Sequence, residues 1–209
     1  MVELFLAILA SLFSIMNPFG AVPLFLGLTS DYTTAHRNST VLQISFYVVL
    51  ILTAFYLAGT FILEFYGISI EAMRIAGGIM IFLTGYGLLT GKQAESRAVS
   101  TTVKAEALEK EDIAFSPMAL PMLAGPGSIS LLITFHSRHA EWSQHLVILA
   151  AILIMGIISF SILRSARFLY KLMGVGGIKA LTRIMGFLTM AIGVEFVVSG
   201  IVKLVTSMV

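Results

Sequence analysis

The sequence NPFGAVP, residues 17–23, interrupts an apolar segment that carries no charged residue between positions 4 and 30. Proline removes a backbone hydrogen-bond donor and its ring clashes with the carbonyl four residues earlier, while glycine loosens a helix further. A second uncharged segment contains AGPGSIS, residues 124–130. The sequence therefore predicts a break in two apolar helices, one in each half of the chain.

The composition is that of an integral membrane protein. Of the 209 residues, 58% are hydrophobic and 11% are charged, and the mean hydropathy is +0.98. A soluble domain cannot bury so much apolar surface. The apolar runs are continuous rather than alternating, which argues against a transmembrane β-barrel. The absence of cysteine excludes disulfides, a thiol nucleophile and thiolate metal ligands.

The fold class expected is an all-α membrane protein with six transmembrane helices. The first helix is expected to be retained, because Glu3 stands where a signal peptide carries Lys or Arg. The mixed-charge segment 91–112 is predicted to be a solvated cytoplasmic linker, with a partner-binding role as the alternative. The spans are expected at roughly residues 3–28, 41–63, 68–90, 113–136, 145–163 and 179–203.

The distribution of Lys and Arg predicts the orientation in the cell membrane. The positive-inside rule places the richer side in the cytoplasm, so both termini are expected outside. The poorer side carries only Arg74, Arg138 and Lys203. The richer side carries Arg37, Lys92, Arg97, Lys104, Lys110, Arg164, Arg167, Lys171, Lys179 and Arg183.

Two landmarks recur at matched spacing in the two halves of the chain. Pro18 is followed 56 residues later by Arg74, and Pro126 is followed 57 residues later by Arg183. Each arginine opens a similar tetrapeptide, RIAG or RIMG. The second and fifth spans show no clear identity in this register. The two landmarks predict an internal repeat that is weak in its middle span.

A repeat of three spans has a topological consequence. An odd number of spans makes the second copy enter the membrane from the opposite side, so the copies are inverted. Secondary transporters use this architecture and bind substrate between broken helices near the midplane. We therefore expect one membrane domain of two inverted three-helix repeats, residues 1–90 and 113–209, with discontinuous helices 1 and 4.

The predicted breaks suit a small zwitterion. Each half-helix that begins after a break has unpaired N–H groups at its positive end, which favour a carboxylate. The carbonyls freed before the break favour an ammonium group or a cation. The alternative is a pair of proline kinks used only for packing. The candidate substrate-binding residues are Asn17, Pro18, Phe19, Gly20, Ala21, Gly125, Pro126, Gly127, Ser128 and Ser130.

Glu195 is the ionisable residue placed deepest in an expected span, and it is the candidate for proton coupling. The alternatives are a hydrogen-bonded structural carboxyl and a position nearer the outer interface. Arg74 and Arg183 are expected to anchor the helices at the interface. Glu71 precedes Arg74 by three residues and can pair with it on one helix face.

Other polar and small residues predict no further chemistry. The four histidines lie near span ends, without the spacing of a metal site, and surface positions are expected for them. The glycine-rich faces of the third and sixth spans are expected to allow close helix packing. The chain shows no nucleotide-binding loop, no nucleophile–base pair and no cofactor fingerprint. We therefore expect no enzyme activity, no cofactor or metal, and no nucleic-acid partner.

The motifs together resemble those of a known family. NPFGAVP at 17–23, RIAGG at 74–78, DIAFSPMALPMLAGPGSIS at 112–130 and RIMG at 183–186 are similar to sequences of the MarC-type integral membrane proteins. The resemblance covers essentially the whole chain, and the third stretch is its most specific part.

The resemblance implies a fold, a substrate class and a set of site residues. Some members, the SnatA-like proteins, transport glycine and alanine, and the fold implied is six helices in two inverted repeats. No motif of the family assigns a coupling role to Glu195. Carried over by motif, the site positions are Asn17, Pro18, Gly20, Gly125, Pro126 and Gly127.

The function expected is a secondary transporter of small neutral amino acids such as glycine and alanine, which works by alternating access. The absence of an ATP site makes an ion gradient of protons or sodium the expected source of energy. The alternative is a channel or an exporter for another small solute. Membrane lipid is an expected partner, and a homo-oligomer is compatible with the sequence.

Overall fold

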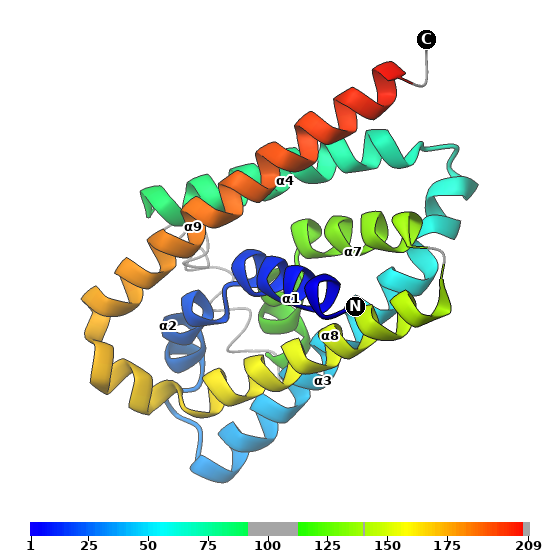
Figure 1. The fold of residues 1–209 in the computed structure, drawn as a ribbon. Coiled ribbons are helices and arrows are strands. Elements are labelled where there is room, and N and C mark those ends of the chain that lie inside the picture. The colour runs from blue at the N-terminus through cyan, green and yellow to red at the C-terminus, as the bar shows by residue number, and fades with distance from the viewer. Residues whose placement is uncertain (92–112, 140, 207–209) are drawn as a thin grey trace.

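The computed structural model describes residues 1–91, 113–139 and 141–206, so the predicted linker lies almost wholly outside the described residues. Every regular element of this part of the chain is a helix (Figure 1). Five segments are long and apolar enough to cross a membrane, and the bent pair η1 (Ala114–Leu123) and α7 (Pro126–Arg138) makes a sixth if counted as one span. The prediction of an all-α membrane protein is therefore confirmed.

The helices follow the expected spans closely and extend beyond two of them. The second helix begins several residues before the apolar segment expected from the sequence. The sixth begins at Ala166 rather than near residue 179, and it is interrupted at Gly174, where φ is 60° and ψ −177°. The elements are α1 (Val2–Met16), α2 (Pro18–Leu28), α3 (Thr34–Phe65), α4 (Ile70–Thr90), η1 (Ala114–Leu123), α7 (Pro126–Arg138), α8 (Trp142–Arg164) and α9 (Ala166–Thr206).

Local polar contacts explain where α3 and α4 begin. The Thr33 hydroxyl accepts the N–H of His36, and the Ser69 hydroxyl accepts the N–H of Ala72, each at 3.2 Å. Such N-caps pair a backbone donor that has no partner inside the helix. The buried side chain of Arg37 donates from its Nε atom to the Thr29 hydroxyl, which ties the start of α3 to the end of α2.

α4 and α9 form a long antiparallel pair, which Figure 1 shows as two adjacent ribbons. Gly78 and Gly85 on α4 face Gly193 and Gly186 on α9, and a Cβ added at any of them would lie 2.5–2.8 Å from the backbone of the other helix. Within each helix the two glycines are seven residues apart, so they form one stripe. The expected close packing of glycine-rich faces is confirmed here.

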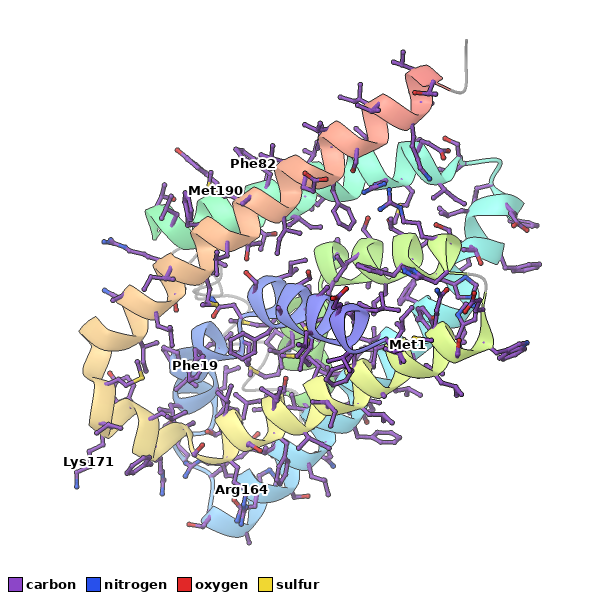
Figure 2. All side chains as sticks on the ribbon, in the orientation of Figure 1. Met1, Phe19, Phe82, Arg164, Lys171 and Met190 are labelled. Atoms are coloured by element: carbon purple, nitrogen blue, oxygen red, sulfur yellow. The ribbon has the colours of Figure 1, made fainter. Side chains whose placement is uncertain are left out.

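The side chains around this pair interlock across the glycine stripe. Figure 2 labels Phe82 of α4 and Met190 of α9 where the two ribbons run together. The backbone nitrogen of Phe82 lies nearest to the position a Cβ would take at Gly193, and that of Met190 nearest to the one at Gly85. Small residues at such a seam let two membrane helices approach until their backbones touch.

The other helices form the body of the molecule. α1 and α2 pack against α8 and α9, whereas η1 packs against α3, and α7 packs against α3 and α4. α3 and α8 also pack against each other. The largest buried side chains of this core include Tyr56, Phe25, Ile8, Leu12, Leu52 and Leu131. Many large apolar side chains on the outer faces are exposed, as expected of surfaces that face lipid.

Candidate functional site

Asn17 separates α1 from α2. It adopts a left-handed backbone conformation with φ 43° and ψ 66°, which few residues other than glycine tolerate. Its N–H donates to the carbonyl of Phe13 at 3.0 Å and closes α1. Its side-chain Oδ1 accepts the N–H of Gly20 at 3.2 Å and opens α2, where Pro18 occupies the first position. Asn17 therefore caps both helices.

The amide nitrogen of Asn17, Nδ2, has no hydrogen-bond partner among the described residues. Asn17 is 1% exposed, and its Nδ2 atom is buried without a hydrogen bond. A Cβ added at Gly20 would lie 2.6 Å from that Nδ2 atom, so glycine at this position leaves room for the amide. A buried unpaired donor destabilises a fold by about 1–3 kcal/mol. An acceptor on a bound molecule would remove this penalty.

The second break lies between η1 and α7, whose axes are bent by 63°. Gly125 is extended, with φ −83° and ψ 175°, and Pro126 occupies the first position of α7. The carbonyl of Gly125 accepts the Ser128 hydroxyl at 2.9 Å and the N–H of Ile129 at 3.1 Å. The first turn of α7 is therefore pinned to the residue that precedes it.

The structure brings the two breaks together. A Cβ added at Gly127 would lie 3.2 Å from Cγ2 of Ile15, two residues before Asn17, and 3.0 Å from Cγ1 of Ile81 on α4. The first turn of α7 thus lies against the last turn of α1. Ser130, one turn later, is positioned to donate to the carbonyl of Met73 at 3.4 Å. The breaks meet where α1, α4 and α7 converge.

The candidate site residues differ in how far they are buried. Phe19, Gly20 and Gly125 are half-buried, and Pro126 is exposed. The ring of Phe19 packs edge-on against Phe13 with the ring centroids 6.0 Å apart, so its described ring contact is within its own half of the chain. Figure 2 shows Phe19 on α2, beside the body of the molecule. The fully buried candidates are Asn17, Pro18, Ala21, Gly127, Ser128 and Ser130.

The structure does not bring Glu195 to the breaks. Its side chain is exposed on α9, whereas its neighbour Phe196 is 7% exposed. Among the described residues no hydrogen bond or ion pair joins the Glu195 carboxylate to either break. The exposure of Glu195 does not show how deep it lies in the membrane, and proton coupling through Glu195 stays a prediction.

Arg74 is a residue whose placement the sequence did not predict. The expected interfacial position is wrong for it, because its side chain is 4% exposed and its Cζ atom lies 5.2 Å from the centroid of the Phe196 ring. The expected pair with Glu71 does not form among the described residues. Arg183, its counterpart in the second half, is exposed. A cation followed by two glycines, Gly77 and Gly78, near the start of an apolar span was the available sequence signal.

Hydrogen bonds between Ser14 and Thr189, which we call the polar clasp, join α1 to α9 just before the first break. The hydroxyl oxygens of Ser14 and Thr189 lie 3.0 Å apart, and both residues are buried. The Thr189 hydroxyl also lies 2.9 Å from the carbonyl of Ser14 and 2.8 Å from that of Met185. Isolated Ser and Thr residues in apolar spans are common, so the sequence carried no signal that these two would meet.

A second polar cluster lies where α3, α7 and α8 meet. The buried Tyr56 hydroxyl is 2.5 Å from Nδ1 of His145, and the rings of His136 and His145 are 4.9 Å apart. The expected surface position is wrong for these two histidines, which are half-buried. Within the described ranges no group of three or more His, Cys, Asp or Glu side chains is placed to hold a metal ion.

Comparison with known proteins places the chain in a family. Residues 2–205 match the MarC family integral membrane protein model. The chain is 38% identical to "UPF0056 inner membrane protein MarC" of Citrobacter koseri, covering 98% of each chain, and 40% identical to "UPF0056 membrane protein MJ1677" of Methanocaldococcus jannaschii, covering 95% and 96%.

A third relative is also named as a UPF0056 membrane protein. "UPF0056 membrane protein YhcE" of Escherichia coli K12 is 38% identical, with 91% of this chain and 88% of that protein covered. No solved structure matches the chain. The sequence match extends over nearly the whole length and includes both breaks, so the chain belongs to the MarC family of integral membrane proteins.

Proposed function

We propose that this protein is a secondary transporter that moves small neutral amino acids, such as glycine and alanine, across the cell membrane by alternating access. The observation that carries the proposal is the meeting of two helix breaks, at Gly127 against Ile15, beside the buried and unpaired amide nitrogen of Asn17. Paired breaks of this kind supply donors and acceptors at membrane depth, where a zwitterion needs both.

The chemistry of the junction fits a small amino acid. The substrate carboxylate is proposed to accept from the first free N–H groups of a half-helix and from Nδ2 of Asn17. The ammonium group is proposed to donate to carbonyls left unpaired at the breaks. A single added carbon at Gly127 would already touch Ile15 and Ile81, so space beside the first turn of α7 is narrow. This narrowness favours glycine and alanine over larger substrates.

The packing of the helices supports the proposal of two inverted repeats. In the first half the broken segment α1–α2 contacts α8 and α9, the last two helices of the second half. In the second half the broken segment η1–α7 contacts α3 and α4, the last two helices of the first half. Two halves related by an inverted repeat would pack in this way, each with its broken segment against the last two helices of the other half. The proposal includes discontinuous first and fourth spans and both termini outside.

Binding is tested with the purified protein by a thermal-shift screen of glycine, alanine and larger neutral amino acids. The proposal predicts that glycine and alanine raise the melting temperature, because a ligand that binds only the folded state stabilises it by mass action. Larger side chains should give smaller shifts. A panel that leaves the melting temperature unchanged, together with no flux above empty liposomes, would refute the proposal.

Transport separates a carrier from a channel. In proteoliposomes loaded with unlabelled glycine, a carrier gives saturable uptake of labelled glycine that depends on the internal substrate. Flux that neither saturates nor depends on exchange would identify a channel for small solutes instead. Repeating the uptake with a proton gradient and then with a sodium gradient identifies the coupling ion. If Glu195 carries the coupling, Glu195→Gln and Glu195→Asn should abolish the effect of the proton gradient on uptake.

A further inference from the structure

Arg74 is a buried cation for which the described residues provide no counter-charge. Its side chain is 4% exposed, and its Nε and Nη1 atoms are buried with no hydrogen-bond partner. Glu71 is half-buried three residues earlier and Glu195 is exposed beside Phe196, but neither forms an ion pair with Arg74 in the described chain. The guanidinium contacts the ring of Phe196, whose centroid lies 5.2 Å from Cζ.

The glycines that follow Arg74 show where its side chain points. A Cβ at Gly77 would collide with the hydroxyl of Ser130 on α7, and a Cβ at Gly78 would lie 2.9 Å from Cβ of Phe196 on α9. Residues three and four positions apart share one face of a helix. Arg74 is therefore directed into the seam between α7 and α9, and not toward lipid.

This seam lies apart from the two breaks. Gly127 at the second break is level with Ile81, seven residues beyond Arg74, which corresponds to about 10 Å along α4. Side chains of a helix tilt toward its N-terminus, so Arg74 points away from that level. The guanidinium therefore belongs to a second polar location, separate from the breaks at Asn17 and Gly127, and the candidate residue Ser130 lies between the two locations.

A second unpaired polar atom lies in the same interface. The hydroxyl oxygen of Thr134 has no hydrogen-bond partner in the part of the chain that the structure describes, and the residue is 2% exposed. α4 and α7 run antiparallel, because Gly127 is opposite Ile81 while Ser130 is opposite Met73. Thr134 follows Ser130 by one turn on the same face, so it lies level with the first turns of α4. That is the direction in which the Arg74 side chain extends.

Each of these unpaired groups can donate a hydrogen bond to an acceptor. A guanidinium stays charged in proteins and offers only donors, and a threonine hydroxyl can donate as well. A buried unpaired charge destabilises the fold strongly, and a contact with an aromatic face offsets it only partly. Ionisable side chains buried in membrane proteins mark ligand or ion pathways. We propose that Arg74 and Thr134 bind a small monovalent anion, a carboxylate or a halide, between α4, α7 and α9.

The test measures anion binding without transport, so its outcome is independent of the proposed function. The purified protein is heated in sodium gluconate, with chloride or acetate replacing gluconate at constant ionic strength. Chloride or acetate should raise the melting temperature by several degrees at saturation. In Arg74→Met, which keeps a flexible unbranched stem but removes the guanidinium and its charge, the rise should disappear. Thr134→Val should shift the response to severalfold higher anion concentration.

The repeat supplies a matched control. Arg183→Met removes the corresponding arginine of the second half, which is exposed, and should keep the full response to anions. If Arg74→Met does not fold, Arg74→Lys and Thr134→Val test the same prediction, since each keeps the charge but removes a donor. Unchanged anion responses in Arg74→Met, or in both conservative variants, would overturn the proposal. A wild-type protein that responds to neither chloride nor acetate would also overturn it.

A glycine titration in gluconate distinguishes the two sources of the anion. If the ligand is the substrate's carboxylate, chloride should compete with glycine, and Arg74→Met should lose the glycine response together with the chloride response. If the ligand is a separate halide, Arg74→Met should lose the chloride response and keep that to glycine. Either result supports the anion site at Arg74 and Thr134. Only the second result, a separate halide, leaves the two breaks as the sole binding place of the substrate.

Discussion

At the scale of single residues, the first break depends on Asn17. Its left-handed backbone, its Oδ1 bond to Gly20 and its unpaired Nδ2 atom give one side chain three roles in about one helical turn. Two of these roles are local capping, which any asparagine can provide. No contact among the described residues explains the third feature, the unpaired Nδ2 atom. We propose that this atom donates to the substrate.

Adding one methyl group at Gly20 should displace the side-chain amide of Asn17 from its place at the first break. In Gly20→Ala the new Cβ would meet Nδ2 of Asn17 at 2.6 Å, so the amide must move. Gly27→Ala in the same helix is the control, because its Cβ would meet nothing within 4 Å. Both variants gain about 0.5–1 kcal/mol of helix propensity. We expect a glycine-induced thermal shift in Gly27→Ala and a much smaller one in Gly20→Ala; equal shifts would contradict the role of Asn17.

The clasp between Ser14 and Thr189 makes a prediction about stability. Thr189→Val keeps the shape of the side chain and leaves the buried Ser14 hydroxyl with fewer partners. The expected loss is about 1 kcal/mol of stability, which lowers the melting temperature by about 2–4 °C for a protein of this size. Thr206→Val, at an exposed hydroxyl near the end of the same helix, should change it far less. A melting temperature equal to that of the wild type would show that the clasp contributes nothing.

At the scale of the helices, the glycine stripe decides how closely α4 and α9 approach. In Gly193→Ala the added Cβ would lie 2.5 Å from the backbone nitrogen of Phe82, which cannot move without shifting α4. Overpacking of this kind destabilises a protein by about 1–3 kcal/mol. Gly176→Ala, also on α9, meets nothing within 4 Å and serves as the control. Thermal unfolding in detergent should therefore separate the two variants, with Gly193→Ala the less stable.

The sequence predicted the elements better than their environments. Pro18 and Pro126 occupy the first positions of α2 and α7, which the sequence could indicate because proline has the same effect in any helix. Arg74 and Arg183 open nearly identical tetrapeptides, yet one is buried against Phe196 and the other is exposed. The difference comes from the helices that pack on each face. Such packing joins residues far apart in sequence, and a single sequence does not encode it in any local pattern.

The residues that were not predicted share this long-range origin. The Tyr56 hydroxyl meets His145 across 89 positions, and Ser14 meets Thr189 across 175. None of these side chains belongs to a recognisable motif. For Glu195 the sequence predicted a depth in the membrane but not a direction, because the distance along a helix does not say which way a side chain faces. The structure places Glu195 on the exposed side of α9.

At the scale of the whole molecule, the account requires that the two breaks touch. The chain has no cysteine, so a pair introduced by Ile15→Cys and Gly127→Cys would be the only one present. The Cβ at position 127 would lie 3.2 Å from Cγ2 of Ile15, which is compatible with a disulfide. We expect mild oxidation to form the bond within one chain, as detected by mass spectrometry. Pairing between chains only would contradict the described packing.

The central claim is that the two breaks form one site for small amino acids, and counterflow tests it most directly. Proteoliposomes loaded with glycine should accumulate labelled glycine, with saturation and with inhibition by alanine. Gly27→Ala should retain this uptake, and Gly20→Ala should lose most of it while remaining folded. Glycine uptake no greater than in empty liposomes, or equal uptake by the two variants, would contradict the account.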